Sequence, residues 1–402
     1  MLARDPGEHG RTASPLELLY DLTLVVAFGV AGTELAHALA AGHVWTGLAG
    51  FAFIQFGAVW AWVSYTWFAA CYDTDDVWVR LAVIAQMVGV LLMALGTPQI
   101  FAGFEDGWRL DNAVVVAGYV VMRLSLIGLY LRAIRANPDR RQPLTRLVVG
   151  TIVLQALWIG TAFIHEITPA WLVAGIALYA AELALPVWVD RAAGGSPWNP
   201  HHLSERFSLL ALIALGESVI GTTAALQALI STQGWTIEVM VLLGTGVSLT
   251  VGLWWIYFGL PLGHFLALDR SRVWPFIFSH FFMYASIAAV GAGLHVAAYE
   301  VEHHNAPGVA GAVASAAVPV TTFLLLTYVV WQLVTREGRV DPFHAVMFAA
   351  TIAVGAVPIV MAIAGAPLVW CIAATTIGPW MSVLGMDLYG RHHAQRLLDR
   401  AG

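Results

Sequence analysis

The chain has 402 residues, of which 59% are hydrophobic and only 11% are charged, and its formal net charge is −6. Soluble domains are about one quarter charged, so the composition excludes an ordinary soluble domain. A helix that crosses a bilayer needs roughly 20 apolar residues, and this chain supplies such runs almost from end to end. We therefore expect an all-α, polytopic integral membrane protein with the lipid bilayer as its main partner.

The apolar runs predict about twelve transmembrane helices. We expect these spans at Leu16–Ala38, Val44–Cys71, Val77–Ile100, Asn112–Ile134, Leu147–Ile164, Ala170–Val189, Arg206–Leu229, Ile237–Leu262, Pro275–Tyr299, Val309–Val334, Pro342–Ala364 and Pro367–Leu388. The clearest boundary is the Gly- and Pro-rich stretch DRAAGGSPWNPHH between the sixth and seventh spans, a composition typical of a linker.

Two loops indicate an internal duplication. After three intervening residues, Asp73 is followed by Val77-Trp78, and Asp269 is followed in the same way by Val273-Trp274. Each loop lies between the second and third spans of its half. We therefore expect one six-helix repeat at 1–189, a cytoplasmic linker at 190–204 and a second repeat at 205–402. Six spans per repeat make the two repeats parallel, a symmetry known among secondary transporters.

Arginine positions predict the orientation, because cytoplasmic loops carry an excess of basic residues. All 19 basic residues are arginines. With twelve spans, the loop and terminal arginines fall on one side, apart from Arg109. They are Arg4, Arg11, Arg80, Arg132, Arg135, Arg140, Arg141, Arg146, Arg191, Arg206, Arg270, Arg272, Arg336, Arg339, Arg391, Arg396 and Arg400. We expect a multi-pass protein of the bacterial-type inner membrane with both termini in the cytoplasm.

Acidic residues stand at the start of the first and seventh spans. Ser14, Pro15 and Glu17 form the pattern of a capping box. A cap does not explain Asp21, which lies one helical turn beyond Glu17. The seventh span begins with Glu205 and Arg206 and carries Glu217 deep in its apolar run. Because a carboxylate inside hydrocarbon needs a partner or a wet cavity, these groups are candidates for substrate binding or proton coupling.

Arg123 is the arginine placed well inside a predicted span. Its guanidinium cannot lose its charge, so it needs a carboxylate or a polar cavity. Asp21 and Glu182 are the candidate partners from the same half of the chain.

Three stretches together resemble a known family. PLELLYDLTLVVAF, YDTDDVWVRL and HLSERFSLLALIALGESVI look like signature segments of the bacterial low-temperature-requirement A (LtrA) membrane proteins. The resemblance extends over the whole chain and implies a many-span membrane protein whose characteristic segments contain the acids named above. Tyr20 departs from the pattern, because the family more often has Phe there. The family name records a growth phenotype and not a biochemical activity.

The DTDD string gathers Asp73, Asp75 and Asp76 in four residues at the end of the second span. Three carboxylates can hold Mg²⁺, which prefers oxygen ligands, and the string fits the pattern of cyclases that protonate an alkene. The alternative is a solvated helix end or an N-cap for the third span. Arg80 lies one turn after Asp76 and is its candidate partner.

The sequence supports two main hypotheses. The first is a secondary transporter that couples protons to a small or anionic substrate through Asp21 and Glu217, with Arg123 holding an anionic group. In this hypothesis Asp269, Arg270 and Arg272 form a cytoplasmic gate against the acids of the DTDD string. The second is a membrane-embedded enzyme on a prenyl diphosphate or isoprenoid lipid, with Mg²⁺ or a proton on those acids and Arg270 and Arg272 on the phosphates.

A further alternative is a non-catalytic stress-response membrane protein. The chain shows no set of Cys and His residues at metal-ligand spacing, no phosphate-binding loop and no basic patch for nucleic acid. The sequence does not predict an oligomeric state.

Overall fold

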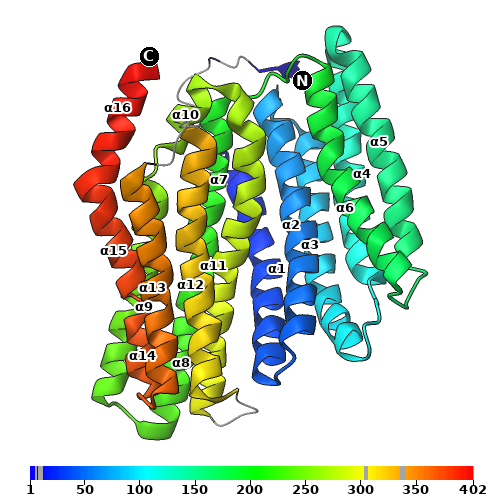
Figure 1. Cartoon of the computed structure of the whole chain (residues 1–402). Helices are drawn as coiled ribbons and strands as arrows, with labels where there is room; N and C mark the ends of the chain where they lie inside the picture. The colour runs from blue at the N-terminus through cyan, green and yellow to red at the C-terminus, as the bar shows by residue number, and fades with distance from the viewer. Residues whose placement is uncertain (5–6, 8–11, 303–306, 336–340, 402) are drawn as a thin grey trace. The chain divides into compact units, whose positions relative to one another are not determined.

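The computed structural model describes residues 1–401 except 5–6, 8–11, 303–306 and 336–340. Three arginines of the orientation argument, Arg11, Arg336 and Arg339, lie outside the described residues, as does the side chain of Asp73. The helices are α1 (Pro15–Ala40), α2 (Val44–Cys71), α3 (Val77–Glu105), α4 (Ala113–Ala136), η1 (Pro138–Arg140), α5 (Arg141–Thr161), α6 (Pro169–Ala192), α7 (Pro200–Ala214), α8 (Gly216–Gln233), α9 (Ile237–Gly259), α10 (Leu262–Leu268), η2 (Arg270–Arg272), α11 (Val273–Val301), α12 (Gly308–Thr335), α13 (Pro342–Ile363), α14 (Leu368–Ala374), α15 (Ile377–Gly385), η3 (Met386–Gly390) and α16 (Arg391–Ala401) (Figure 1).

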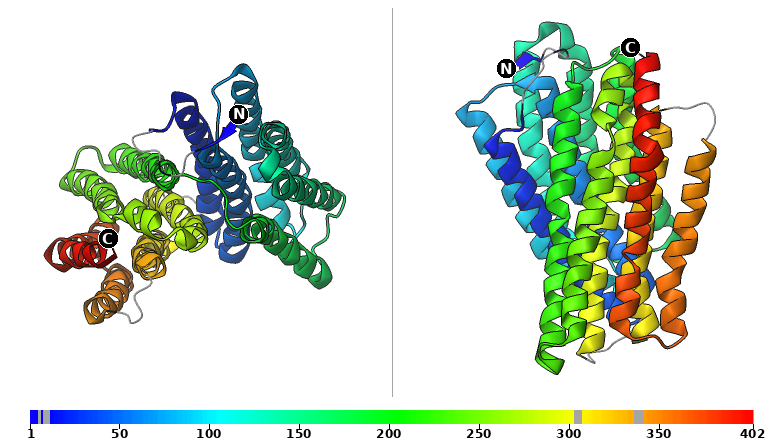
Figure 2. Two further views of the ribbon diagram at one scale, coloured as in Figure 1. Left: turned by 90° about the horizontal axis from the view of Figure 1, so that it is seen from above. Right: turned by 90° about the vertical axis from the view of Figure 1, so that its left-hand side faces the viewer.

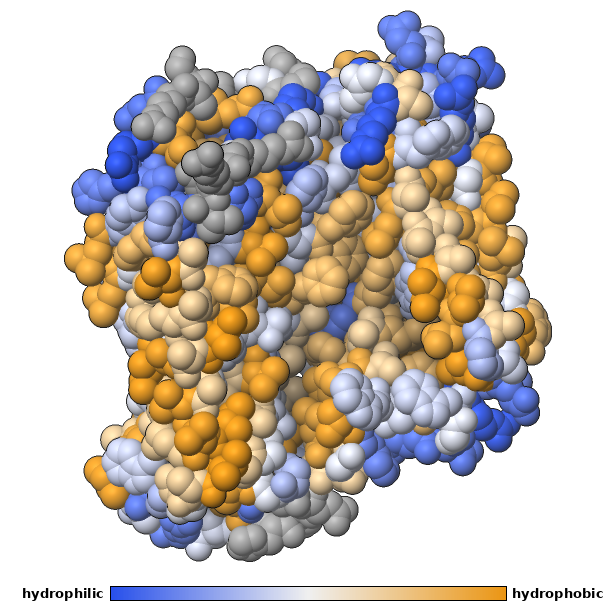
Figure 3. Space-filling view, in the orientation of Figure 1, coloured by the Kyte–Doolittle hydropathy of each residue, from blue (hydrophilic) through white to orange (hydrophobic). Residues whose placement is uncertain are grey.

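The predicted all-α membrane fold is confirmed. Twelve helical segments of the described chain are long and apolar enough to cross a bilayer. Hydrophobic side chains cover the middle of the helices, and hydrophilic ones gather toward the helix ends (Figure 3). This distribution suits a bilayer, whose interior has no water for polar groups. The helices also satisfy their own backbone hydrogen bonds there.

Several helices begin earlier or break where the apolar pattern predicts one continuous span. The fifth span starts at Arg141 and the seventh at Pro200, because polar first turns extend a helix beyond its apolar run. The seventh span breaks between α7 and α8 at Leu215, and the eighth breaks at Pro261, whose ring removes a backbone donor. The twelfth breaks after Ala374.

The chain divides into two compact units. Unit 1 contains Met1–Ala31 and Trp45–Arg206, and unit 2 contains Gly32–Val44 and Phe207–Gly402. The helices of each unit run side by side along nearly one direction (Figure 2). The units divide the chain close to the predicted linker, but the end of α1 is assigned to unit 2.

The order of packing is alike in the two units. In unit 1, α3 packs on α4, α4 on α5 and α5 on α6. In unit 2, α11 packs on α12, α12 on α13, and α13 on α14 and α15. The duplication into two parallel repeats nevertheless stays a prediction.

The N-terminus of unit 1 pairs with the DTDD loop. Strand β1 (Leu2–Ala3) runs antiparallel to β2 (Tyr72–Asp73), with Leu2 opposite Asp73. The Arg4 amide donates to the Cys71 carbonyl at 2.9 Å. The side chain of Asn137 accepts from the Ala3 amide at 3.0 Å.

The predicted linker is anchored to unit 1. The Asn199 amide donates to the Ala70 carbonyl at 3.0 Å, and Arg140 donates to the Gly195 carbonyl at 2.6 Å. Gly194 and Gly195 have φ of 71° and 100°, a left-handed conformation that glycine adopts without steric cost.

The α3–α4 crossing generates a prediction. A Cβ at Gly118 would lie 2.4 Å from the Gly89 carbonyl oxygen, whereas a Cβ at Gly128 in the same helix meets nothing within 4 Å. We expect Gly118→Ala to lower the free energy of unfolding by about 1–3 kcal/mol through overpacking. Gly128→Ala is the matched control and should not destabilise. Denaturation of the purified variants checks this, and equal stability of the two would contradict the close crossing.

Candidate functional site

Helix α2 carries polar contacts on two opposite faces in unit 1. Trp60 and Ser64 lie one turn apart on one face, and Trp62 and Tyr65 lie on the other. Each face contacts a separate buried ion cluster. We call these the Asp21 cluster (Glu17, Asp21, His202 and Arg206) and the Glu182 cluster (Arg123 and Glu182).

The capping box at the start of α1 is confirmed. The Ser14 amide donates to Glu17 Oε2 at 2.7 Å, and the Glu17 amide donates to Ser14 Oγ at 3.3 Å. The cap uses one oxygen of Glu17. The other oxygen, Oε1, lies 3.0 Å from Arg206 Nη1 and 3.3 Å from His202 Nε2, so Glu17 is both a helix cap and an ion-pair partner.

Asp21 shares Arg206 with Glu17. Arg206 Nη2 donates to Asp21 Oδ1 at 2.5 Å, and Trp62 Nε1 donates to the same oxygen at 2.6 Å. The guanidinium of Arg206 also lies 5.7 Å from the ring centroid of Trp62 and 5.9 Å from that of Tyr65. Asp21, His202 and Arg206 have no exposed surface. The aromatic rings therefore enclose the shared cation.

The Asp21 cluster has more acids than permanent cations. Two carboxylates face one guanidinium, and His202 supplies a second positive charge only when it is protonated. Asp21 Oδ2 is buried and accepts no hydrogen bond from any described residue. A bare, buried carboxylate oxygen is costly, so one added proton, on Asp21 or His202, would balance the charge.

The charges of the Glu182 cluster are paired with each other. Arg123 Nη2 lies 2.8 Å from Glu182 Oε2, which also accepts from Trp60 Nε1 at 3.1 Å. Glu182 Oε1 accepts from Gln155 and Trp158, both at 3.1 Å. The predicted pairing of Arg123 with an acid is thus confirmed, with Glu182 as the partner. Since one cation meets one carboxylate, this cluster has no need of a proton.

A groove in unit 1 leads to Glu17. It has a volume of about 610 Å³, within the range of small-molecule sites. Its polar wall contains Glu17, Arg4, Tyr65, Asp75 and Arg80. Glu17 is therefore the member of the Asp21 cluster that lines the groove.

Two acids of the DTDD string, Asp75 and Asp76, are held by separate arginines. Asp75 receives two hydrogen bonds from Arg80, each 2.9 Å. Asp76 pairs with Arg132 through both oxygens and caps α3 by accepting from the Val79 amide at 3.0 Å. The expected Arg80–Asp76 pair is wrong, because the cap turns Asp76 toward Arg132. The hydrogen bonds from Arg132 lower the pKa of Asp76 to about 2.

This arrangement does not fit a magnesium site. The carboxylate oxygens of Asp75 and Asp76 pair with two different guanidinium groups. Within the described chain, no three His, Cys, Asp or Glu side chains are grouped to hold a metal ion.

Nor do Asp75 and Asp76 need cations from the loop of Arg270 and Arg272. Arg272 pairs with Asp269 of its own loop at 2.9 Å, and Arg270 lies in the same short turn, η2.

The remaining predicted acids stand apart from these clusters. Glu205 Oε1 accepts from the Ala13 amide at 3.3 Å. Glu217, in unit 2, lies in the first turn of α8 with 8% of its surface exposed. The residues that the structure describes supply no ion pair to Glu217, so its role in proton coupling stays a prediction.

Unit 2 contains a buried histidine whose role the sequence does not predict. His280 has no exposed surface, and its Nδ1 lies 2.7 Å from the Phe276 carbonyl. Its Nε2 lies 3.0 Å from the Tyr257 hydroxyl. With Nδ1 as donor and Nε2 as acceptor, the ring is satisfied in its neutral form. Only the spacing to Phe276, one helical turn, is visible in the sequence.

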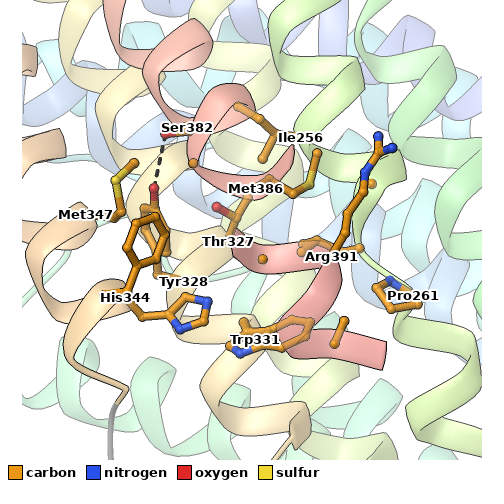
Figure 4. A pocket seen from close by; sticks show the side chains of 16 residues that line it. Ile256, Pro261, Thr327, Tyr328, Trp331, His344, Met347, Ser382, Met386 and Arg391 are labelled. Atoms are coloured by element: carbon orange, nitrogen blue, oxygen red, sulfur yellow. Dashed lines mark hydrogen bonds between the residues drawn. The ribbon is translucent and has the colours of Figure 1, made fainter. Parts of the chain in front are cut away.

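A small cavity in unit 2 lies beside the break in the eighth span at Pro261 (Figure 4). It has a volume of about 60 Å³ and is lined by Trp331, His344 and Arg391. Tyr328 donates to Ser382 Oγ across it at 3.1 Å. This volume has room for a few water molecules only, so unit 1 contains the better candidate site.

The Glu182 cluster generates a prediction. We expect Glu182→Gln to lower the free energy of unfolding by about 3–5 kcal/mol, because it leaves the buried charge of Arg123 unpaired. Adding Arg123→Gln should restore part of the loss. Asp75→Asn, at a pair that is 58% and 73% exposed, is the control and should change stability by less than about 1 kcal/mol. The free energies of unfolding are measured by denaturing all variants in one detergent. A double variant less stable than Glu182→Gln would contradict the pairing.

Comparison with known proteins agrees with this membrane architecture. The family model described as bacterial low temperature requirement A protein (LtrA) matches residues 12–378. An uncharacterized protein of Rhizobium meliloti (strain 1021) is 29% identical over 255 residues, which are 61% of this chain and 58% of that protein. No solved structure matches the chain. The match over more than half of its length shows that the chain belongs to the bacterial low temperature requirement A family.

Proposed function

We propose that this protein is a proton-coupled secondary transporter and that the Asp21 cluster is its proton site. The observation that carries the proposal is the shared cation: two buried carboxylates face one arginine, and Asp21 Oδ2 has no donor among the described residues. Buried ionisable groups inside membrane spans mark proton relays and substrate pathways in many transporters. The Glu182 cluster is balanced in charge and gives no comparable reason to bind a proton.

The cluster links proton binding to helix position. Glu17 and Asp21 are on α1, and Arg206 and His202 are on α7. With both acids ionised, Arg206 attracts two charges on α1. A proton on Asp21 Oδ2 removes one of these attractions, so the tie between the two helix ends weakens. The proton would then bind the two conformations of the protein with different free energies. It would shift the equilibrium toward the conformation that it binds more tightly, as alternating access requires.

The groove at Glu17 gives the proton and a substrate an approach to the cluster. Arg4 and Arg80 line it together with the acids, which suits a small or anionic substrate. Arg123 is an unsuitable holder for such a group, because binding would have to break its pair with Glu182. The gate of Asp269, Arg270 and Arg272 stays a prediction on which this proposal does not rest, since Asp269 and Arg272 pair with each other.

The proposal is tested by following protonation directly. We expect infrared difference spectra, recorded between high and low pH on the purified protein, to show the C=O stretch of one buried protonated carboxyl group. Asp21→Asn should remove that signal, and Asp106→Asn, at an exposed acid, should not. In proteoliposomes holding a pH dye, Asp21→Asn should also abolish substrate-driven proton movement. An unchanged carboxyl signal in Asp21→Asn would refute Asp21 as the proton site.

The orientation is a separate prediction. If the arginine-rich ends face the cytoplasm, reporters fused after Gly402 and inserted after Arg140 should both be active as cytoplasmic fusions in the bacterial inner membrane. A reporter inserted after Asp106, beyond the third span, should behave as periplasmic. A Gly402 fusion that is active only outside the cytoplasm would overturn this topology.

A further inference from the structure

A second large cavity of unit 1 has a wall of aromatic side chains. It has a volume of about 610 Å³ and lies between the start of α2, the end of α3 and the start of α6. We call it the aromatic pocket. Its aromatic lining consists of Phe53, Phe56, Phe104, Trp108, Trp158, Trp171 and Tyr179. No charged side chain lines it, so it differs in chemistry from the groove at Glu17.

The rings of the pocket hold one another in place. Tyr179 lies 4.2 Å from Phe56 and 4.9 Å from Trp158 between ring centroids, both pairs in edge-to-face geometry. In edge-to-face packing the positive edge of one ring contacts the negative face of the other. Gly175 lets the ring of Trp171 lie close to α6, since a Cβ there would be 3.2 Å from that ring.

Trp108 is held in an unfavourable backbone conformation. Its φ is 61°, the one positive value at a non-glycine position in the described chain. A bulky residue in this region costs of order 1–3 kcal/mol, and such strain clusters at ligand sites. The bridge between Arg109 and Glu166 fixes the neighbouring backbone. The strained conformation places the indole of Trp108 in the pocket wall.

A buried carboxylate lies behind the pocket wall. Trp158, which lines the pocket, donates to Glu182 Oε1. Arg123 binds the opposite oxygen, Oε2. The carboxylate of Glu182 therefore lies directly behind the Trp158 ring of the pocket wall. Aromatic faces carry negative potential as well, so both features favour a cation and disfavour an anion.

The pocket can be reached from the lipid side. Leu172 and Ile176 belong to its lining and are 53% and 59% exposed. On a membrane-spanning helix such apolar exposure faces lipid. We propose that the aromatic pocket binds a lipophilic organic cation that enters from the bilayer. This site is distinct from the proton site of the Asp21 cluster, and the inference does not depend on transport.

Binding of a probe cation tests the inference. The protein in nanodiscs of neutral lipid is titrated with tetraphenylphosphonium, and empty nanodiscs are subtracted. We expect saturable binding that becomes about tenfold weaker in Tyr179→Leu and in Trp171→Leu, since losing one cation–π contact removes of order 1–2 kcal/mol. Tyr179→Phe and Trp171→Phe retain a ring and should bind nearly as the unchanged protein does. Trp45→Leu is the control, because Trp45 is 78% exposed and lies outside the pocket.

Tetraphenylborate has the same shape and the opposite charge. It should not bind at the pocket. Equal binding of borate with the same variant pattern would show a hydrophobic site without charge preference and overturn the proposal. Equal affinities of the Leu and Phe variants would do the same, and so would the absence of saturable phosphonium binding. Asp21→Asn should bind the probe normally, which separates this result from failure of the proton site. Variants are compared only after their unfolding midpoints show intact folding. If a variant at Tyr179 or at Trp171 fails to fold, the other position still tests the proposal.

Discussion

The sharing of Arg206 between Glu17 and Asp21 is the constraint on which unit 1 depends most. Three charged groups meet in a region with no exposed surface at Asp21 or Arg206. Removing charges from water is expensive, and mutual attraction repays the cost only with good geometry and further hydrogen bonds. Ser14, Trp62 and His202 supply these further contacts. They also fix where the first turns of α1 and α7 lie within the unit.

Helix α2 joins this cluster to the rest of the unit. Its Trp62 serves the Asp21 cluster, and its Trp60 serves the Glu182 cluster. A rotation of α2 would disturb both sets of hydrogen bonds at once. The two clusters are therefore supported by one rigid element, although only one of them has an unbalanced charge. In our proposal the Glu182 cluster holds the fold and the Asp21 cluster changes its protonation.

Local patterns in the sequence predict much of this architecture. Twelve spans follow from apolar runs, the capping box follows from Ser14 and Glu17, and the need of Arg123 for an acid follows from its permanent charge. Contacts between distant segments do not follow. Nothing near Asp76 indicates Arg132, which is 56 residues away, and helical spacing alone favours the incorrect Arg80–Asp76 pair. His202 lies one helical turn before Arg206, and it faces Glu17 only because α7 starts six residues before the apolar run.

The separation along the chain between Asp21 and Arg206 also has a consequence for biogenesis. The two residues are 185 positions apart, and synthesis proceeds at about 5–20 residues per second. The first span must therefore wait roughly 10 to 40 s for its counter-ion. An ionised aspartate without a partner inside a span makes insertion less favourable. During this interval the newly made α1 is a poorly inserting segment, so it should stay near the insertion machinery, or near the membrane surface, until the seventh span emerges.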